Sequence, residues 1–264
     1  MRWSSGLSLY RACLIAGLGL PVSFICAMLA AQFGYAGVRE PLVALAQPDV
    51  QHAIRLSILC ATAATMLGMT MAIPSAYVLA RFRFPGRMLI DALLDIPIII
   101  SPIAIGMTLL LMFRTGPGSW VQEHLVRCIF EVPGIILAQF TVALALQVRV
   151  LKASFEEVSP RLEQVARYLG CGPWAAMWRV TLPLAKPGLI AALVLGWGRA
   201  IGEYGATVTI AGSVSGKTET IPVAIVLNWS GVRIEAAIGL VMVLTFIALL
   251  VLLSVRLVAG GARS

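Results

Sequence analysis

The chain contains little charge for its length. Asp, Glu, Lys and Arg together make up 12% of its 264 residues, whereas a soluble domain usually carries about 25%. Hydrophobic residues make up 59%, and the mean hydropathy is +0.93. This composition excludes an ordinary soluble protein and indicates an integral membrane protein.

The chain is also poor in groups that bind metals, form disulfides or act as nucleophiles. Its two His (His52 and His124) and five Cys are scattered, with no CxxC pair and no zinc-ligand spacing. No Ser-His-Asp or Cys-His constellation is evident. We therefore expect no metal site, no disulfide, no catalytic residue and no cofactor bound by this chain.

Six apolar runs are long enough to cross a hydrocarbon core of ~30 Å. In lipid each run must be a helix, because its backbone groups have to be satisfied internally. The predicted fold class is all-α, with six transmembrane helices in a single domain covering 1–264. The first run resembles a signal peptide in position, but it is long and lacks a small-residue cleavage site, so we expect a retained helix. The predicted helices are 12–33, 53–80, 88–113, 132–151, 188–211 and 235–258.

The placement of Lys and Arg predicts the orientation. With the N-terminus inside, thirteen of the 20 basic residues fall on the inner side, from Arg2 to Arg263, six fall outside, and Arg199 lies within a span. Both termini and the longest hydrophilic segment, 154–188, are then cytoplasmic. The net charge of +8 reflects this asymmetry, and we expect lipid rather than nucleic acid as the environment.

The segment 154–188 has the pattern of a helical hairpin. Pro160 can open a helix, Gly170 and Gly172 interrupt it, and Pro173 can start a second one. The hairpin would lie at the membrane surface, where it could contact another protein.

The first helix of this hairpin has an apolar face and a polar one. The polar residues Glu163, Gln164 and Arg167 could face a partner, or the helix could simply pack against its own bundle; periodicity favours neither. The apolar face comprises Leu162, Val165, Ala166 and Leu169.

The same residues resemble a family motif. Importer-type ABC transporter permeases carry Glu-Ala-Ala, three residues, Gly, nine residues, Ile, one residue and Leu-Pro in a cytoplasmic loop. Here the pattern is Gln164-Val165-Ala166, Gly170, Val180 and Leu182-Pro183, with the spacing intact and two residues altered.

This resemblance implies a coupling helix that docks onto a separate ATP-hydrolysing subunit, present in two copies, which binds ATP and Mg²⁺. The contact residues it implies are Glu163, Gln164, Ala166, Arg167 and Gly170. Either Gln164 or its neighbour Glu163 could take the place of the motif's Glu.

A second resemblance narrows the subfamily. The stretch GRAIGEYGATVTIAGSVSGKTETIPVAI from Gly198, and RFRFPGRMLIDALLDIPIIISPIAIG over 81–106, look like molybdate, tungstate and sulfate permeases. Together with the loop, the similarity covers roughly 52–257. It implies a symmetric homodimer with the substrate path on its two-fold axis, and a solute-binding protein that delivers substrate from outside.

Charged residues within the spans are candidate path residues, since each costs ~2.5–3.5 kcal/mol at mid-membrane. Arg199 and Glu203 are four residues apart in the fifth span and should pair with each other or with a neighbour. They could form a gate, or a packed ion pair that fixes helix register. Asp91 and Asp95 motivate an alternative of another class, a proton-coupled secondary transporter, although salt bridges to a neighbouring basic turn would explain them too.

The remaining candidates are polar or helix-breaking residues. Pro102, Gly106 and Thr108 are placed at the path chiefly by the subfamily resemblance. The stretch Ala211–Thr218 fits a relaxed Walker A pattern, but a transmembrane helix precedes it and no soluble nucleotide domain is expected. We interpret it as an outer turn in which Ser213, Ser215, Lys217 and Thr218 offer donors to a passing oxyanion.

The sequence therefore predicts a permease subunit of an ATP-driven importer, located in the inner membrane, and not an enzyme. The favoured substrate is molybdate or tungstate, with sulfate or another solute as the alternative.

Overall fold

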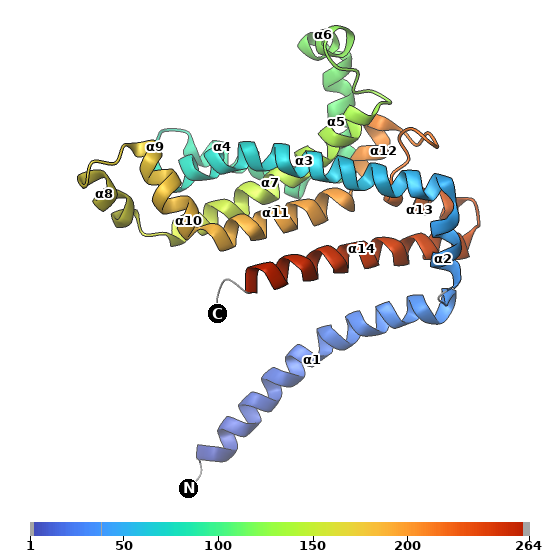
Figure 1. The fold of residues 1–264 in the computed structure, drawn as a ribbon, viewed down its shortest axis with the longest axis horizontal. Coiled ribbons are helices and arrows are strands. Elements are labelled where there is room, and N and C mark those ends of the chain that lie inside the picture. Colours follow the sequence, from blue (N-terminus) through green and yellow to red (C-terminus); the bar gives the residue numbers. More distant parts are fainter. Residues whose placement is uncertain (1–2, 38, 261–264) are drawn as a thin grey trace.

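The computed structural model describes residues 3–37 and 39–260, and all regular structure in these ranges is helical, which confirms the all-α prediction. Arg2 and Arg263, which were counted on the inner side, lie outside the described residues. The helices (Figure 1) are α1 Trp3–Ala36, α2 Arg39–Ala46, α3 Pro48–Arg81, α4 Arg87–Ile99, α5 Pro102–Arg114, α6 Gly116–His124, α7 Val132–Glu157, α8 Pro160–Tyr168, α9 Pro173–Ala176, the π-helix η1 Met177–Thr181, α10 Leu182–Leu184, α11 Lys186–Ile201, α12 Gly205–Ala211, α13 Ile221–Ser230 and α14 Ile234–Gly260.

Up to six membrane spans can be counted among the described residues. Four are single helices: Cys13–Tyr35 within α1, α3, α7, and Ile234–Leu253 within α14. Two more are bent pairs, α4 with α5 at 113° and Pro173–Leu184 with α11 at 74°. The predicted number of spans agrees with this count.

The third predicted span, 88–113, is broken near its middle. Pro102 opens α5, where its missing N–H costs nothing, and the Ser101 hydroxyl accepts a hydrogen bond from Ala104 N at 3.4 Å. A new helix therefore starts in a different direction, and α5 points away from the main bundle (Figure 1).

The fifth predicted span, 188–211, is wrong as a single helix. α11 ends at Ile201 and α12 begins at Gly205. Between them the Glu203 carboxylate accepts the backbone N–H of Ala206 at 2.9 Å, which satisfies a donor at the start of α12. Hydropathy merges the two helices into one run, because the break itself is apolar apart from this residue. The short apolar helix α13 was not predicted.

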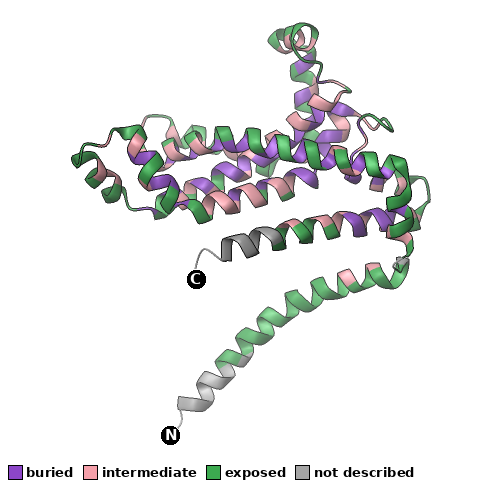
Figure 2. Ribbon diagram, in the orientation of Figure 1, coloured by how far each residue is buried: buried purple, intermediate pink, exposed green. Residues whose placement is uncertain are grey.

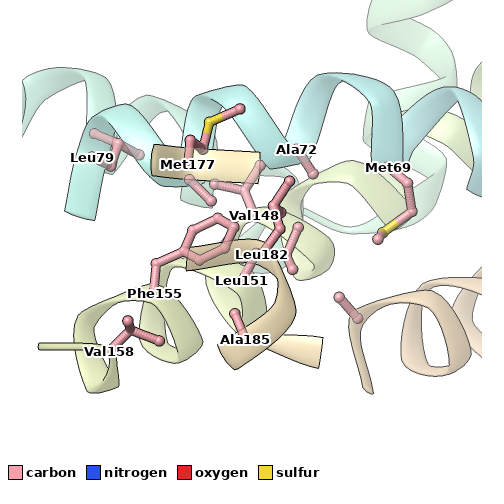
Figure 3. Packing of buried hydrophobic residues seen from close by; sticks show 12 residues of the cluster. Met69, Ala72, Leu79, Val148, Leu151, Phe155, Val158, Met177, Leu182 and Ala185 are labelled. Atoms are coloured by element: carbon pink, nitrogen blue, oxygen red, sulfur yellow. The ribbon is translucent and has the colours of Figure 1, made fainter. Parts of the chain in front are cut away.

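The centre of the molecule is the packing of α3, α7 and α11. Near the hairpin their buried side chains join those of η1 and α10 in one cluster, in which Phe155 and Leu151 of α7 lie against Met177 and Leu182 (Figure 3). Burial is concentrated on the faces that these helices turn toward one another (Figure 2). This cluster packs the segment that follows the hairpin, η1 and α10, against the central helices.

A buried amide holds the three central helices together. Gln147 of α7 is fully buried, and its Nε2 donates to the carbonyl oxygen of Thr65 in α3 at 3.2 Å. A Cβ on Gly196 of α11 would lie 2.5 Å from this nitrogen, and one on Gly68 of α3 would overlap the amide oxygen. The two glycines therefore create the space that the Gln147 side chain fills.

α1 stands apart from this bundle. Its candidate span has no buried residue, and the helix is exposed along its described length apart from two half-buried positions (Figure 2). Its main contacts, among the described residues, are with α2 and α14. An apolar helix that is exposed over most of its surface is suited to contact with lipid or with another membrane subunit.

Candidate functional site

The hairpin helix α8 begins and ends at positions that the sequence specifies. Pro160 occupies its first turn, with Glu163 following there and Arg167 in the last turn, as the helix dipole favours. Beyond the helix, Gly170 N donates to Arg167 O and Cys171 N donates to Ala166 O, both at 3.0 Å. This pair of bonds is a Schellman motif, and it requires the left-handed φ of +93° that Gly170 adopts.

The apolar side chains of α8 point outward. The helix has no buried residue, and Leu162 and Val165 are exposed, while Tyr168 is 90% and Leu169 81% exposed. The structure therefore differs from the alternative in which the apolar face packs on the bundle. It presents a hydrophobic surface at the end of the molecule opposite α13 (Figure 1).

The polar residues of α8 do not share one environment. Gln164 and Arg167 are exposed, as expected for a partner-facing surface, and so is Gly170, while Ala166 is half-buried. The Glu163 side chain is only 12% exposed and is turned toward the bundle, contrary to the expectation that it lies with Gln164 and Arg167. Of the two Leu-Pro residues, Leu182 is buried in the central cluster and Pro183 is exposed.

Glu163 lies at the centre of a polar cluster formed by Tyr77, Arg81, Glu163 and Thr181, here called the Glu163 cluster. Its Oε2 accepts the Tyr77 hydroxyl at 2.9 Å, and its Oε1 accepts Arg81 Nε at 2.8 Å and the Thr181 hydroxyl. Arg81 also donates to the carbonyl oxygen of Val158, just after α7, at 2.9 Å. One carboxylate thus connects α3, α8 and η1.

A second region brings α5 and α12 into close contact. A Cβ on Gly106 would lie 2.7 Å from the Thr209 Cβ and 2.8 Å from the Ala206 oxygen, and Gly205 faces Pro102 in the same way. The predicted path residues Pro102 and Gly106 therefore meet the start of α12. We call this pair of helices the α5–α12 unit.

Thr108 lies on a different, exposed face of α5. Its hydroxyl donates to the carbonyl oxygen of Ala104 at 2.9 Å. Three apolar side chains share this exposed side of the helix, namely Ile103, Met107 and Leu111. This face is available to line a path or to meet another subunit.

Arg199 and Glu203 form the predicted ion pair, with Arg199 Nη1 lying 2.6 Å from Glu203 Oε2. Glu203 is 1% exposed and uses its other oxygen on Ala206 N, whereas the Arg199 side chain is 36% exposed. The pair therefore links the end of α11 to the start of α12. This geometry fits the structural interpretation, and the exposed part of Arg199 leaves the gate interpretation open.

The turn after α12 is stabilised by its own polar groups. Lys217 Nζ lies 2.5 Å from Glu131 Oε1, at the start of α7, and the buried Thr218 hydroxyl accepts Val214 N at 3.1 Å. Ser213 is half-buried and Ser215 exposed. Of the four predicted donors, Lys217 is thus paired within the protein, and the Thr218 hydroxyl serves as an acceptor. In the loop that precedes α7, burial raises the pKa of the Cys128 thiol, which disfavours its reactive thiolate.

Asp91 and Asp95 both pair with cations of α7. Asp91 lies 2.5 Å from Lys152, and Asp95 contacts Arg149. The predicted salt-bridge role is confirmed, but the partners lie on α7 and not in the basic turn before α4. Arg87 of α4 continues the series by pairing with Glu156 at 3.7 Å. Carboxylates that are each engaged by a cation are poorly placed to relay protons.

Several site residues were not found from the sequence. Tyr77, Arg81 and Thr181 carry no local signal, because their common partner Glu163 is between 18 and 86 residues away. Within the described ranges, no group of three or more His, Cys, Asp or Glu residues could hold a metal ion.

Comparison with known proteins identifies the class to which this architecture belongs. Residues 64–260 match the family model described as "Binding-protein-dependent transport system inner membrane component". The chain is 35% identical over 218 residues to the sulfate transport system permease protein CysW of Synechocystis sp., covering 82% of this chain and 79% of the relative. It is 36% identical over 177 residues to the molybdenum transport system permease protein ModB of Haemophilus influenzae, covering 65% and 76%.

Two further similarities extend over nearly the whole chain. The sulfate transport system permease protein CysT of Escherichia coli is 32% identical over 255 residues, covering 96% of this chain and 90% of the relative. The crystal structure of a bacterial ABC transporter that imports the acidic polysaccharide alginate has the same fold, with a TM-score of 0.72 over 99% of this chain and 100% of that one at 18% identity.

The chain therefore belongs to the family of inner-membrane components of binding-protein-dependent transport systems. It is a multi-pass permease of the importer-type ABC class and a transport component rather than an enzyme. The resemblance to permeases of this class, and within it to sulfate and molybdate permeases, is confirmed.

Proposed function

We propose that this chain is the permease subunit of an ATP-driven importer for a tetrahedral oxyanion, with molybdate or tungstate as the first choice and sulfate as the alternative. The support for the substrate class comes from relatives named as sulfate and molybdenum permeases, whose identities to this chain are 35% and 36%. These two identities are too similar to favour one substrate, so molybdate, tungstate and sulfate should all be tested.

The observation that carries the coupling part of the proposal is the outward apolar surface of α8. The helix ends in a Schellman motif and leaves Val165, Tyr168 and Leu169 exposed, and an exposed apolar patch of this kind marks a surface that a partner covers. We propose that α8 is the coupling helix and that these side chains, with Gln164, Ala166, Arg167 and Gly170, dock into an ATP-binding subunit. ATP and Mg²⁺ are held by that subunit, present in two copies, and none of them by this chain.

The remaining partners are a second copy of this chain and an extracytoplasmic solute-binding protein. The exposed α5 face that carries Met107 and Thr108, and the isolated α1, would be covered in a homodimer whose path follows the two-fold axis. A related importer has been crystallised with its periplasmic protein bound to an alginate pentasaccharide, at a TM-score of 0.69 over 96% of this chain. We propose a single permease domain with Pro102, Gly106, Ser213, Ser215 and Lys217 at or near the path.

The proposed orientation places both termini in the cytoplasm, as the distribution of Lys and Arg predicts. In support, α1 starts and α14 ends toward the hairpin end of the long axis (Figure 1). ATP binding would close the two ATP-binding subunits, and the coupling helices would carry that movement to the bundle as a rigid-body shift.

The test is uptake into proteoliposomes that contain this chain with its ATP-binding subunit and binding protein. We expect uptake of radiolabelled molybdate or tungstate that requires ATP in the liposome lumen, on the side of the ATP-binding subunits. Collapsing a proton gradient should leave this uptake unchanged. ATP-dependent uptake of sulfate under the same conditions would change the proposed substrate to sulfate and leave the proposed mechanism unchanged. Uptake driven by a proton gradient without ATP would contradict the proposal and favour the secondary transporter.

A further inference from the structure

We infer that Glu163 is the positioning residue that joins the coupling helix to the membrane bundle, so that force applied to α8 reaches α3 and η1 through one carboxylate. The inference rests on the proposed function of α8. It assigns Glu163 to the inner side of the helix, and so removes it from the surface that meets the ATP-binding subunit.

The first argument is that α8 has almost nothing else to hold it. None of its residues is buried, and its large apolar side chains are exposed. Among the described residues, no other α8 side chain forms a hydrogen bond or ion pair with the bundle. Apolar burial cannot fix the helix to the bundle, so the attachment depends on the Glu163 cluster and on the chain connections at the two ends of α8.

The second argument is the geometry of that attachment. Both carboxylate oxygens are used, and the three donors come from two separate elements: Tyr77 and Arg81 from the last turns of α3, and Thr181 from η1. Arg81 has a further bond to the Val158 oxygen, where the chain leaves α7. The Glu163 cluster therefore holds α8 at a fixed position relative to α3 and η1, and Arg81 also connects it to the end of α7.

The third argument is burial. The Arg81 and Glu163 side chains are 8% and 12% exposed. Charge-assisted hydrogen bonds in such surroundings are stiffer and stronger than exposed ones, because water neither competes for the groups nor screens them. A flexible surface pair would allow α8 to move without the bundle, whereas a shielded pair makes them move together.

The position of Thr181 shows where the movement would go. η1 is a π-helix that continues through α10 into α11, and π-helical turns interrupt the regular bonding of a helix and are frequent at functional sites. A shift of α8 would act on η1 and on the end of α3 at once. Both elements belong to the packed α3–α7–α11 centre, which would then move as a unit.

The experiment uses the complete importer in proteoliposomes and measures substrate transported per ATP hydrolysed, together with recovery of the ATP-binding subunit on the purified permease. Glu163→Gln keeps the shape and loses the charge. We expect transport per ATP to fall about tenfold, within the range usual for coupling between two sites, while the ATP-binding subunit is still recovered at wild-type levels. Glu157→Gln, an exposed acid just before the hairpin, is the matched control and should change neither quantity.

A double-mutant cycle tests whether Arg81 acts through Glu163. Arg81→Gln should cause a loss similar to that of Glu163→Gln, and the double variant should lose no more than the worse single variant, because both remove one joint. Should either charged variant fail to fold, Tyr77→Phe and Thr181→Val each remove one donor and should lower transport per ATP a few-fold.

Three outcomes would overturn the inference. The first is unchanged transport per ATP in Glu163→Gln, and the second is losses that multiply in the double variant. The third is loss of the ATP-binding subunit in parallel with uptake, which would make Glu163 a contact residue. Failure of the proposed function is distinguishable from all three, because the wild-type protein itself would then show no ATP-dependent uptake.

Discussion

The hairpin and the α5–α12 unit are held in place by different means. At the hairpin, a buried carboxylate gathers donors from two other elements, and charged pairs between α4 and α7 lie close by. In the α5–α12 unit, two helices approach closely at Gly106, where there is no room for a Cβ, and at Gly205, where a Cβ would be tight. The hairpin is thus held by polar side-chain interactions, and the α5–α12 unit is held by close packing of two helices.

This difference bears on how each region can move. At the hairpin, shielded hydrogen bonds to one carboxylate connect separate helices, so a movement of α8 is passed on to the helices that supply the donors. Two backbones in direct contact have one arrangement, because packed interiors do not deform continuously. We therefore expect the hairpin to transmit movement through a joint and the α5–α12 unit to move as a rigid piece.

The largest effect is expected at the ion pair that joins α11 to this unit. Arg199→Gln leaves the Glu203 charge buried without its cation, and breaking a buried pair in this way costs about 3–5 kcal/mol. Because Arg199 is partly exposed, we expect the lower end of that range. Thermal unfolding of the purified permease in detergent measures the loss.

The double variant Arg199→Gln with Glu203→Gln separates the two interpretations of the pair. The amide that replaces the Glu203 carboxylate keeps an acceptor for Ala206 N, so stability should recover, and with it uptake if the pair serves packing and capping. Stability that recovers while uptake does not would assign Arg199 to the gate.

A smaller effect is expected from Gly106→Ala, which tests the rigidity of the α5–α12 unit directly. The added methyl group would meet backbone atoms of Ala206 at 2.8 and 2.9 Å, and overpacking of this kind typically costs about 1–3 kcal/mol. Uptake should fall together with the unfolding temperature. The control is Gly198→Ala in α11, where a new Cβ meets nothing within 4 Å. Equal behaviour of the two variants would contradict the description of a close-packed block.

The smallest effect on stability is expected at the hairpin, from Gly170→Ala. The alanine must adopt the left-handed φ of +93°, which costs about 1–2 kcal/mol, although nothing crowds the site. The helix end should loosen, so hydrogen exchange over 160–170 should quicken and uptake should fall more than stability does. Gly172→Ala, at an exposed neighbouring glycine without a left-handed φ, should leave both unchanged. An equal loss of uptake in Gly172→Ala would contradict the assignment of the effect to the left-handed backbone of Gly170.

Local patterns were sufficient to predict most of the fold. Apolar runs located the spans, and Pro160 and Gly170 marked the ends of α8, because these signals depend on a residue's own backbone or immediate environment. The fifth span was wrong for the opposite reason: its break depends on a hydrogen bond made by Glu203 in an otherwise apolar stretch.

The candidate site was predictable in outline only. Periodicity separated the two faces of α8, but it could not show which one turns inward. That choice depends on Arg81 and Tyr77, which lie 82 and 86 residues before Glu163. Because Glu163 adjoins the motif position Gln164, the sequence suggests that it contacts a partner. Its hydrogen bonds to Tyr77 and Arg81 of α3 show instead that it faces the bundle.

The amide of Gln147 limits what the transport cycle can change inside one subunit. The side chain extends from α7 into space left by two glycines, Gly68 of α3 and Gly196 of α11, which both lie against it. Sliding α3 or α11 by one turn, about 5.4 Å, would replace a glycine beside the amide with a residue that has a side chain, and sliding α7 would withdraw the amide from both glycines. The packing of α3, α7 and α11 therefore resists sliding of one helix along another, so we expect these three helices to move together as one body.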